Sequence, residues 1–167
     1  MTTSFSHSAT IKATPAAVYA AYSSKGYWQD RVANVGAPED HVDEFSAGDD
    51  GVRVVVTHAI PDSEIPDAAK KVLRGGLVIR RTTTYDPFDG ERITGSAHAE
   101  AAGGLGVIDG SGEATSVAAD TVVESVSGTV KVSVPLLGGR LEKMVVDYLD
   151  KLFTAEYAHL DAWVSKA

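Results

Sequence analysis

A long amphipathic helix near the C-terminus constrains the fold of this chain more than any other feature. The spacing of apolar residues predicts one helix over about residues 139–165. One broad face of it carries Leu141, Val145, Tyr148, Leu149, Leu152, Leu160 and Trp163, and the opposite face carries Lys143, Asp147, Asp150, Thr154 and Asp161. At about 1.5 Å per residue such a helix crosses a whole small sheet, so the rest of the chain must offer it an apolar surface.

The residues before this helix predict that surface, an antiparallel sheet. Phe5, His7, Ala9 and Ile11 alternate with polar residues, which is the pattern of a half-buried strand. Further strands are predicted at residues 42–45, 52–57, 77–85, 92–100, 105–117 and 121–134. Because the links between these strands are short, neighbours along the chain should pair antiparallel as a meander of about seven strands.

Two short helices are predicted after the first strand. Thr14 offers a capping hydroxyl, and Pro15 stands where a helix tolerates proline, so a helix should start there and end near Gly26. Trp28 and Val32, four residues apart, indicate a second helical piece before a turn at residues 36–38. Together these elements predict an α+β fold.

Length and charge limit the classes of protein to consider. At 167 residues we expect a single domain over residues 1–167. The chain carries 15 basic and 23 acidic residues, a net charge of −8, which disfavours nucleic acid as a partner. No run approaches the ~18 apolar residues that span a bilayer, and the start lacks the pattern of a secretory signal. We therefore expect a cytoplasmic protein without an integral membrane segment.

The sequence has no recognisable metal, cofactor or hydrolase motif. Without cysteine there are no disulfides or thiolate nucleophiles, and the histidines lack metal-ligand spacing. The glycines at residues 103–106 lack the Lys-Ser/Thr of a phosphate-binding loop, and no serine sits in a nucleophile elbow. We predict no metal and no cofactor.

The order of these elements resembles the helix-grip layout. The residues that carry the resemblance are 5–11, 14–19, 26–28 and 130–135, the last leading through Gly138-Gly139 into residues 140–142. The chain looks like a member of the START-like (SRPBCC) superfamily, which includes lipid-transfer domains, polyketide cyclases and aromatases. It is most similar to one of the families of unknown function within it. The fold implied is a curved antiparallel sheet wrapped around the long C-terminal helix.

The resemblance implies a cavity between helix and sheet that holds a hydrophobic molecule. Aromatic residues make up only 7% of the chain, and the strands around residues 95–112 are rich in Gly, Ala and Ser. Small side chains leave room for a ligand, although the helix could instead settle closer to the sheet. The expected ligand-binding residues are Trp28, Val54, Val56, Ile79, Arg81, Tyr85, Val130, Val145, Tyr148, Leu152, Glu156 and His159.

Polar residues inside this predicted interior are the candidates for chemistry. Strand alternation turns His58 and Arg81 inward, where a paired Arg81 would fix a ligand carboxylate or phosphate, unless a bulge returns it to solvent. Glu156 and His159, three residues apart, interrupt the apolar stripe of the long helix. They are either polar fixtures of the cavity, such as an acid–base pair, or contacts with the sheet edge or the short helices.

Three functions remain open at this point. The first is a non-catalytic carrier of a lipid, isoprenoid or polyketide-like compound, which the lack of a catalytic set favours. The second is an enzyme of the cyclase, aromatase or dehydratase kind, with His159, Glu156, His58 and Tyr148 as candidate proton carriers. The third is a protein interaction module, whose partner the sequence does not specify.

Overall fold

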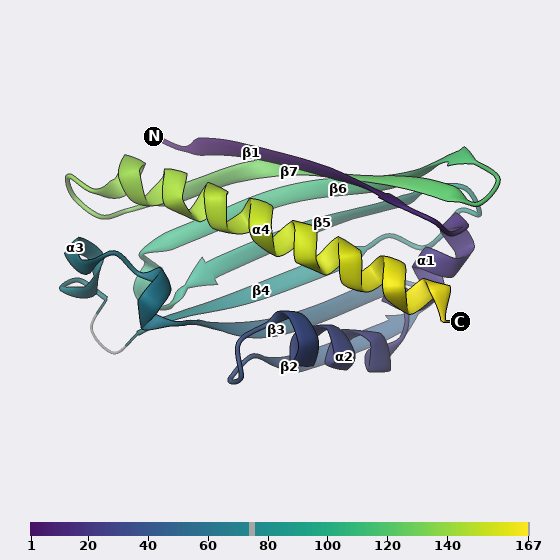
Figure 1. Cartoon of the computed structure of the whole chain (residues 1–167), viewed down its shortest axis with the longest axis horizontal. Coiled ribbons are helices and arrows are strands. Elements are labelled where there is room, and N and C mark those ends of the chain that lie inside the picture. The colour runs from purple at the N-terminus through teal and green to yellow at the C-terminus, as the bar shows by residue number, and fades with distance from the viewer. Residues whose placement is uncertain (74–75, 167) are drawn as a thin grey trace.

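The computed structural model describes residues 1–73 and 76–166. Its strands are β1 Thr3–Ile11, β2 His41–Gly48, β3 Gly51–Ile60, β4 Leu77–Tyr85, β5 Ile93–Ala101, β6 Gly106–Ala118 and β7 Thr121–Val132. Its helices are α1 Pro15–Tyr22, α2 Lys25–Val35, α3 Asp67–Lys70 and α4 Gly138–Ser165, with short 3-10 turns at η1 Asp62–Glu64 and η2 Ala102–Gly104. The α+β helix-grip fold predicted from the sequence is confirmed (Figure 1).

The seven strands form one antiparallel sheet in the order β1-β7-β6-β5-β4-β3-β2. From β2 to β7 every strand pairs with the next one along the chain, which is the predicted meander. β1 is the exception, because it pairs with β7 and sets Thr3 opposite Val130. The chain therefore has to cross the sheet between its two edges, and α1 and α2 make that crossing.

The start of α1 follows the prediction and its end does not. Thr14 accepts a hydrogen bond from the Ala17 amide at 3.2 Å, with proline as the first helical residue. α1 ends at Tyr22, ahead of the predicted end near Gly26, because Ser24 caps a new helix by accepting the Tyr27 amide at 3.4 Å. Gly26 thus lies inside α2.

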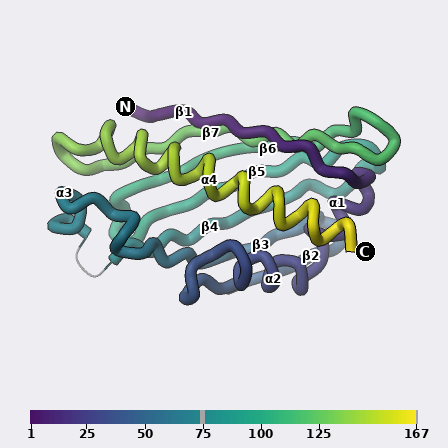
Figure 2. Tube along the Cα trace, in the orientation of Figure 1, coloured from purple at the N-terminus to yellow at the C-terminus, as the bar shows by residue number. Residues whose placement is uncertain are grey.

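α4 runs diagonally across the concave face of the sheet (Figure 1). It packs against β1 and β7 along its length and against α1 and α2 near its C-terminal end, as the trace in Figure 2 also shows. Glu142, 1% exposed, anchors its first turns by accepting hydrogen bonds from the Val132 amide at 3.0 Å and the Thr3 hydroxyl at 2.9 Å. Among the described helices, none is long and apolar enough to cross a membrane.

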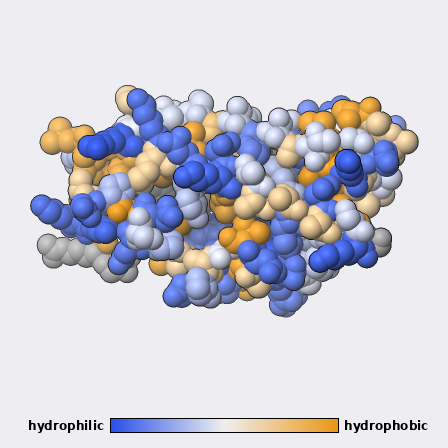
Figure 3. Space-filling model, in the orientation of Figure 1, coloured by the Kyte–Doolittle hydropathy of each residue, from blue (hydrophilic) through white to orange (hydrophobic). Residues whose placement is uncertain are grey.

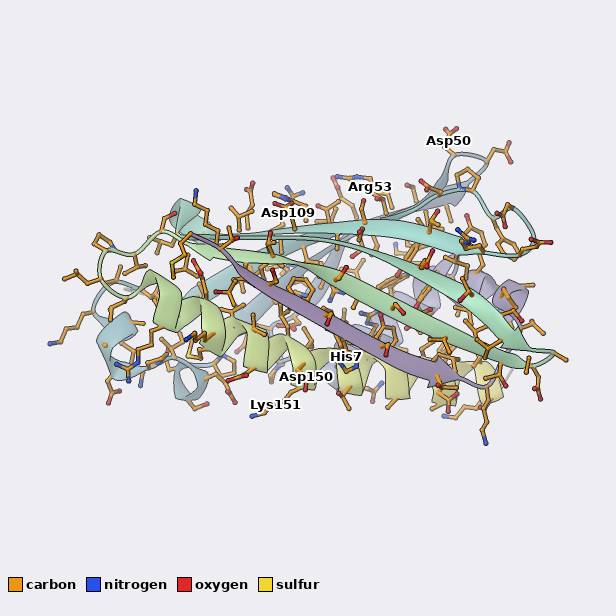
Figure 4. All side chains as sticks on the ribbon, turned by 90° about the horizontal axis from the view of Figure 1, so that it is seen from above. His7, Asp50, Arg53, Asp109, Asp150 and Lys151 are labelled. Atoms are coloured by element: carbon orange, nitrogen blue, oxygen red, sulfur yellow. The ribbon has the colours of Figure 1, made fainter. Side chains whose placement is uncertain are left out.

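The two faces of the sheet differ in character. In Figure 4, Arg53 and Asp109 project from the face turned away from α4, whereas His7 of β1 meets Asp150 of α4. His7 Nδ1 lies 2.8 Å from the Asp150 carboxylate. Hydrophilic residues also cover most of the outer surface around α4, with apolar side chains in smaller patches between them (Figure 3). The apolar surface is thus concentrated between α4 and the sheet.

Candidate functional site

A cavity of about 380 Å³ lies between the N-terminal half of α4 and the concave face of the sheet. Small inward-facing side chains of β5 and β6 line its floor, among them Ala97, Ala99, Ala101 and Gly110. Such side chains fill little of the volume beneath a helix, whereas the interior of a packed protein leaves few voids. The small-residue strands therefore account for the space.

The roof and the end wall of the cavity are mainly apolar, and the exposed Glu64, Asp147 and Lys151 are the charged residues that border them. The roof consists of residues of α4, namely Leu141, Met144, Val145, Tyr148, Leu149, Leu152 and Phe153. The end wall comes from the segment between β3 and β4, where Ile65 and Ala69 are buried against Val134 and Leu141. The segment containing η1 and α3 thus closes the end of the cavity away from α2.

Charged side chains gather at the inner end of the cavity. Arg81 of β4 donates to both carboxylate oxygens of Glu156 at 2.9 and 3.1 Å, and Arg31 of α2 forms a second ion pair with the same carboxylate. Burial opposes ionisation of Glu156, but the two guanidinium groups outweigh it and lower the pKa of this carboxyl to about 2. Glu156 is therefore a buried carboxylate clamped between two cations.

Arg81 keeps part of its side chain turned toward the cavity. Its ion pair uses one terminal nitrogen, Nη1, and the side chain remains 17% exposed while it lines the cavity. Arg31, by contrast, is 9% exposed and its guanidinium lies 4.7 Å over the ring of Trp28. Of the two arginines, only Arg81 is among the residues that line the 380 Å³ cavity.

His58 of β3 also lines the cavity at this end. Its Nδ1 lies 2.9 Å from the carboxylate of Asp40, which also accepts the Ala59 amide at 2.8 Å. The side chain of Asp40 is 4% exposed and that of His58 is 12% exposed. Burial and the neighbouring Arg81 cation lower the pKa of His58, so its imidazole is neutral near pH 7.

A smaller polar chamber of about 60 Å³ lies beyond Arg81 and Phe153, which line both spaces. In it the Tyr22 hydroxyl donates to the carboxyl group of Glu124 at 2.6 Å. Glu124 is 6% exposed, and burial raises its pKa to about 7. The interior thus has a large apolar compartment and a small polar one, with Arg81 between them.

The predicted ligand-binding residues divide between these spaces. Those that line the 380 Å³ cavity are Ile79, Arg81, Val130, Val145, Tyr148 and Leu152. Trp28, Val56 and Glu156 border a gap of about 20 Å³ beside α2, Tyr85 lines the small chamber, and Val54 is fully buried in the core. That these residues contact a ligand remains a prediction.

Glu156 and His159 each have a separate partner on α2. Glu156 binds Arg31, whereas His159 Nε2 lies 2.7 Å from a carboxylate oxygen of Asp30 and its ring lies 5.4 Å from that of Tyr27. The predicted contact between this end of the helix and the short helices therefore describes His159. For Arg81, the inward orientation is the observed one, and its partner is Glu156.

Sequence reasoning missed Arg31, Asp40 and Glu124. Two of them left a signal, because Arg31 stands in the apolar stripe of α2 beside Trp28 and Val32, and Glu124 shares the inward parity of β7 with Val122 and Val126. Glu156 stands out in the sequence because it is a charged residue at an apolar position, and Arg31 and Glu124 stand out for the same reason. Asp40 lies in a loop, where no periodicity applies.

The geometry defines a helix-grip protein with an internal, mostly apolar cavity. The chain belongs to the family described as "Protein of unknown function (DUF2505)", whose model matches residues 6–164. An uncharacterised protein of Mycobacterium tuberculosis is 25% identical over 177 residues, covering 99% of this chain and 98% of the relative.

Solved structures share the fold at low sequence identity. A conserved protein from Geobacillus kaustophilus superposes with a TM-score of 0.62 at 12% identity, covering 98% of this chain and 96% of that one. The Zhui aromatase/cyclase from Streptomyces sp. R1128 superposes with a TM-score of 0.61 at 11% identity, covering 99% and 95%. At this identity the similarity establishes the fold alone.

Proposed function

We propose that this protein binds and carries a hydrophobic small molecule of the lipid, isoprenoid or polyketide-like kind in the cavity beneath α4. One observation carries the proposal: a cavity of about 380 Å³ has a mainly apolar lining and has buried charges at one end. This volume lies in the range of small-molecule pockets. An apolar ligand gains about 25 cal/mol for each Å² of apolar surface that it removes from water.

The arrangement of the cavity also favours one orientation of the ligand. Leu105, Val134 and Leu141 surround the outer part, whereas Arg81 and His58 lie at the inner end. A molecule with an apolar body and one polar group would therefore place that group toward Arg81. A structural neighbour is an aromatase/cyclase, which supports including polyketide-like compounds among the ligands to screen.

Native mass spectrometry of the purified protein, followed by thermal shift with a panel of lipids and isoprenoid and polyketide-like compounds, tests the proposal. We expect a bound species or stabilisation by at least one compound class. Ala99→Leu, which adds bulk to the cavity floor, should abolish that binding. Thr129→Leu is the matched control, because Thr129 is exposed and lies beside the cavity-lining Val130 on the opposite face of β7.

The same experiment separates the carrier from the other two functions. A carrier releases its ligand with unchanged mass and unchanged chromatographic retention. Loss of the mass of one water would indicate a dehydratase, and an unchanged mass with a new retention time would indicate a cyclase. If no compound binds and the cavity variant matches wild type in every assay, the carrier function is wrong. A stable protein partner recovered under those conditions would then support an interaction module.

A further inference from the structure

The pair formed by Asp40 and His58 leaves one ring nitrogen of the histidine unpaired and buried in the wall of the cavity. Asp40 accepts from the Ala59 amide and lies 2.9 Å from His58 Nδ1, so the carboxylate holds the proton of the imidazole on Nδ1. Nε2 then carries a lone pair. This atom is buried and has no hydrogen-bond partner among the residues that the structure describes.

A buried polar atom without a hydrogen-bond partner, such as His58 Nε2, needs a physical explanation, and the residues around it suggest one. His58 and Arg81 stand on adjacent strands as diagonal neighbours, since Val56 pairs with Arg81 and His58 pairs with Ile79. Both side chains line the same end of the cavity. An acceptor nitrogen and a guanidinium donor thus belong to the wall of the same space.

The buried charges at this end already balance. On the cavity side, Arg31 and Arg81 supply two positive charges, and Glu156 and Asp40 supply two negative ones, while His58 is neutral. Glu124, whose pKa is about 7, lies outside this count in the small chamber beyond Arg81. A ligand carboxylate entering alone would add an uncompensated negative charge to an apolar cavity, which is strongly unfavourable. A proton placed on His58 Nε2 at the same time restores the balance.

The other titratable groups around the cavity are exposed or uncharged near pH 7. Tyr148 lines the roof and its pKa is raised by burial, so it stays neutral. Glu64, Asp147 and Lys151 line the cavity but are exposed, so water compensates their charges. Within the described lining of this cavity, only His58 is placed to accept a proton at the buried end. Glu124, whose pKa is about 7, lies in the small chamber beyond Arg81, and proton uptake that persists in His58→Gln would point to Glu124 instead.

We infer that the ligand is a carboxylic acid with an apolar body, taken up together with one proton that His58 Nε2 holds while the carboxylate lies between His58 and Arg81. This inference rests on the proposed function and specifies its ligand class. Near pH 7.5 the free ligand is already a carboxylate, so the proton comes from the buffer: a buffer acid loses it, the N–H bond forms on Nε2, and no bond of the ligand changes. A phosphate monoester fits less well, because it brings up to two negative charges to a site with one vacant proton acceptor.

Isothermal titration calorimetry at pH 7.5 with decanoic acid tests this inference. Repeating the titration in phosphate and in Tris, which differ in ionisation enthalpy, gives the number of protons taken up per ligand. We expect about one proton per decanoate for wild type and none for the control ligand 1-decanol. His58→Gln should lose the uptake and bind decanoate about tenfold to a hundredfold more weakly, with 1-decanol unchanged.

His159→Gln is the matched control variant. Like His58, His159 is paired with an aspartate and has one buried ring nitrogen without a partner among the described residues, but it contacts Asp30 and Tyr27 rather than the cavity. It should keep wild-type proton uptake. If His58→Gln does not fold, the imidazole resonances of wild type with and without decanoate report the protonation of His58 directly.

The outcomes separate this inference from the function on which it rests. Tight binding of decanoate without proton uptake, or uptake that persists in His58→Gln, overturns the role of His58. Binding of 1-decanol but not of decanoate overturns the acid ligand and leaves the carrier function intact. If neither compound binds and the wider panel also fails, the carrier function itself is wrong.

Discussion

The two halves of α4 cover interiors of different kinds. Beneath the N-terminal half, alanines and glycines of β5 and β6 leave about 380 Å³ unfilled. Beneath the C-terminal half, Tyr22, Tyr27 and Trp28 are at most 2% exposed and pack with Leu160, and the rings of Tyr22 and Tyr85 stack at 4.4 Å. One sheet and one helix therefore hold both a cavity and a packed core.

The difference follows from which elements fill the space beside the helix. α1 and α2 contribute aromatic side chains to the C-terminal half, whereas the segment with η1 and α3 contributes only residues such as Ile65 and Ala69 to the other end. The ion pairs of Glu156 mark the border between them. Stability should thus depend on the packed half, and ligand binding on the open half.

The largest expected effect on stability comes from removing the Glu156 carboxylate at the border between the two halves. Glu156→Gln removes the carboxylate from between Arg31 and Arg81 and leaves two buried cations unpaired. We expect a loss of about 3–5 kcal/mol in the free energy of unfolding, measured by urea denaturation. Glu113→Gln is the control, since its ion pair with Arg92 is exposed and its loss should change stability by less than about 0.5 kcal/mol. Equal stability of the two variants would contradict the role of the clamp.

The next effect concerns Glu124 at the packed end and depends on pH. Burial raises the pKa of this carboxyl in the folded protein to about 7, above the 4.5 of an unperturbed glutamate. Its protonated form is favoured by folding, so this contribution is complete below about pH 4.5 and is lost as the pH rises through 7. Glu124→Gln, which mimics the neutral acid, should remove a decline of about 3 kcal/mol between these pH values.

Urea denaturation of wild type and Glu124→Gln at pH 4.5, 6 and 8 measures this decline. Glu156 gives the opposite sign, because its pKa is lowered to about 2. The stability contribution of Glu156 is present above about pH 4.5 and is lost as the pH falls through 2. A wild-type stability that is flat from pH 4.5 to 8, together with an unchanged Glu124→Gln profile, would contradict the assignment of Glu124.

The same substitution at two alanines compares the halves directly. Ala99 is buried on the cavity floor and Ala21 is buried in the aromatic core cluster. Ala21→Leu should destabilise the protein by about 1–3 kcal/mol through overpacking, whereas Ala99→Leu has empty space for the added atoms and should cost less than about 1 kcal/mol. Thermal unfolding of both variants measures the contrast, and similar melting temperatures would mean that the cavity closes in solution.

The smallest expected effect lies in the turn that leads into α4. Leu136 is fully exposed and has a φ of 67°, a conformation that favours glycine. Leu136→Gly should therefore raise the free energy of unfolding by up to about 1 kcal/mol, because it removes backbone strain without losing a buried contact. Chemical denaturation gives the change. A clear destabilisation would show that the leucine side chain has a contact in solution.

Periodicity predicted the elements of this fold and some of its interior residues. The alternation of residues 5–11 and the stripe of α4 gave β1 and the long helix, and the stripe also exposed Glu156 as an exception. Parity along β4 placed Arg81 inward. In each case the pattern within one strand or helix is enough to predict the face on which a side chain lies, because that face depends only on the position in the element.

Contacts between elements that are distant in the chain could not be predicted from the sequence. Arg31 meets Glu156 from α2, and Asp40 meets His58 from the loop before β2. Neither contact depends on a repeat within one element, because each requires the relative position of two elements in space. The cavity volume could not be predicted for the same reason, since it depends on how closely α4 approaches β5 and β6.

The pairing of β1 with β7 has a consequence for the order in which the chain folds. The first strand finds its partner only after more than a hundred residues, with Thr3 opposite Val130. The meander from β2 to β7 can form from contacts between sequence neighbours, but β1 can pair only after β7 has been made, and α4 follows β7 in the chain. Such long-range closure slows folding. We expect chains truncated before α4 to expose the concave face of the sheet, so the cavity forms only after α4 has been made.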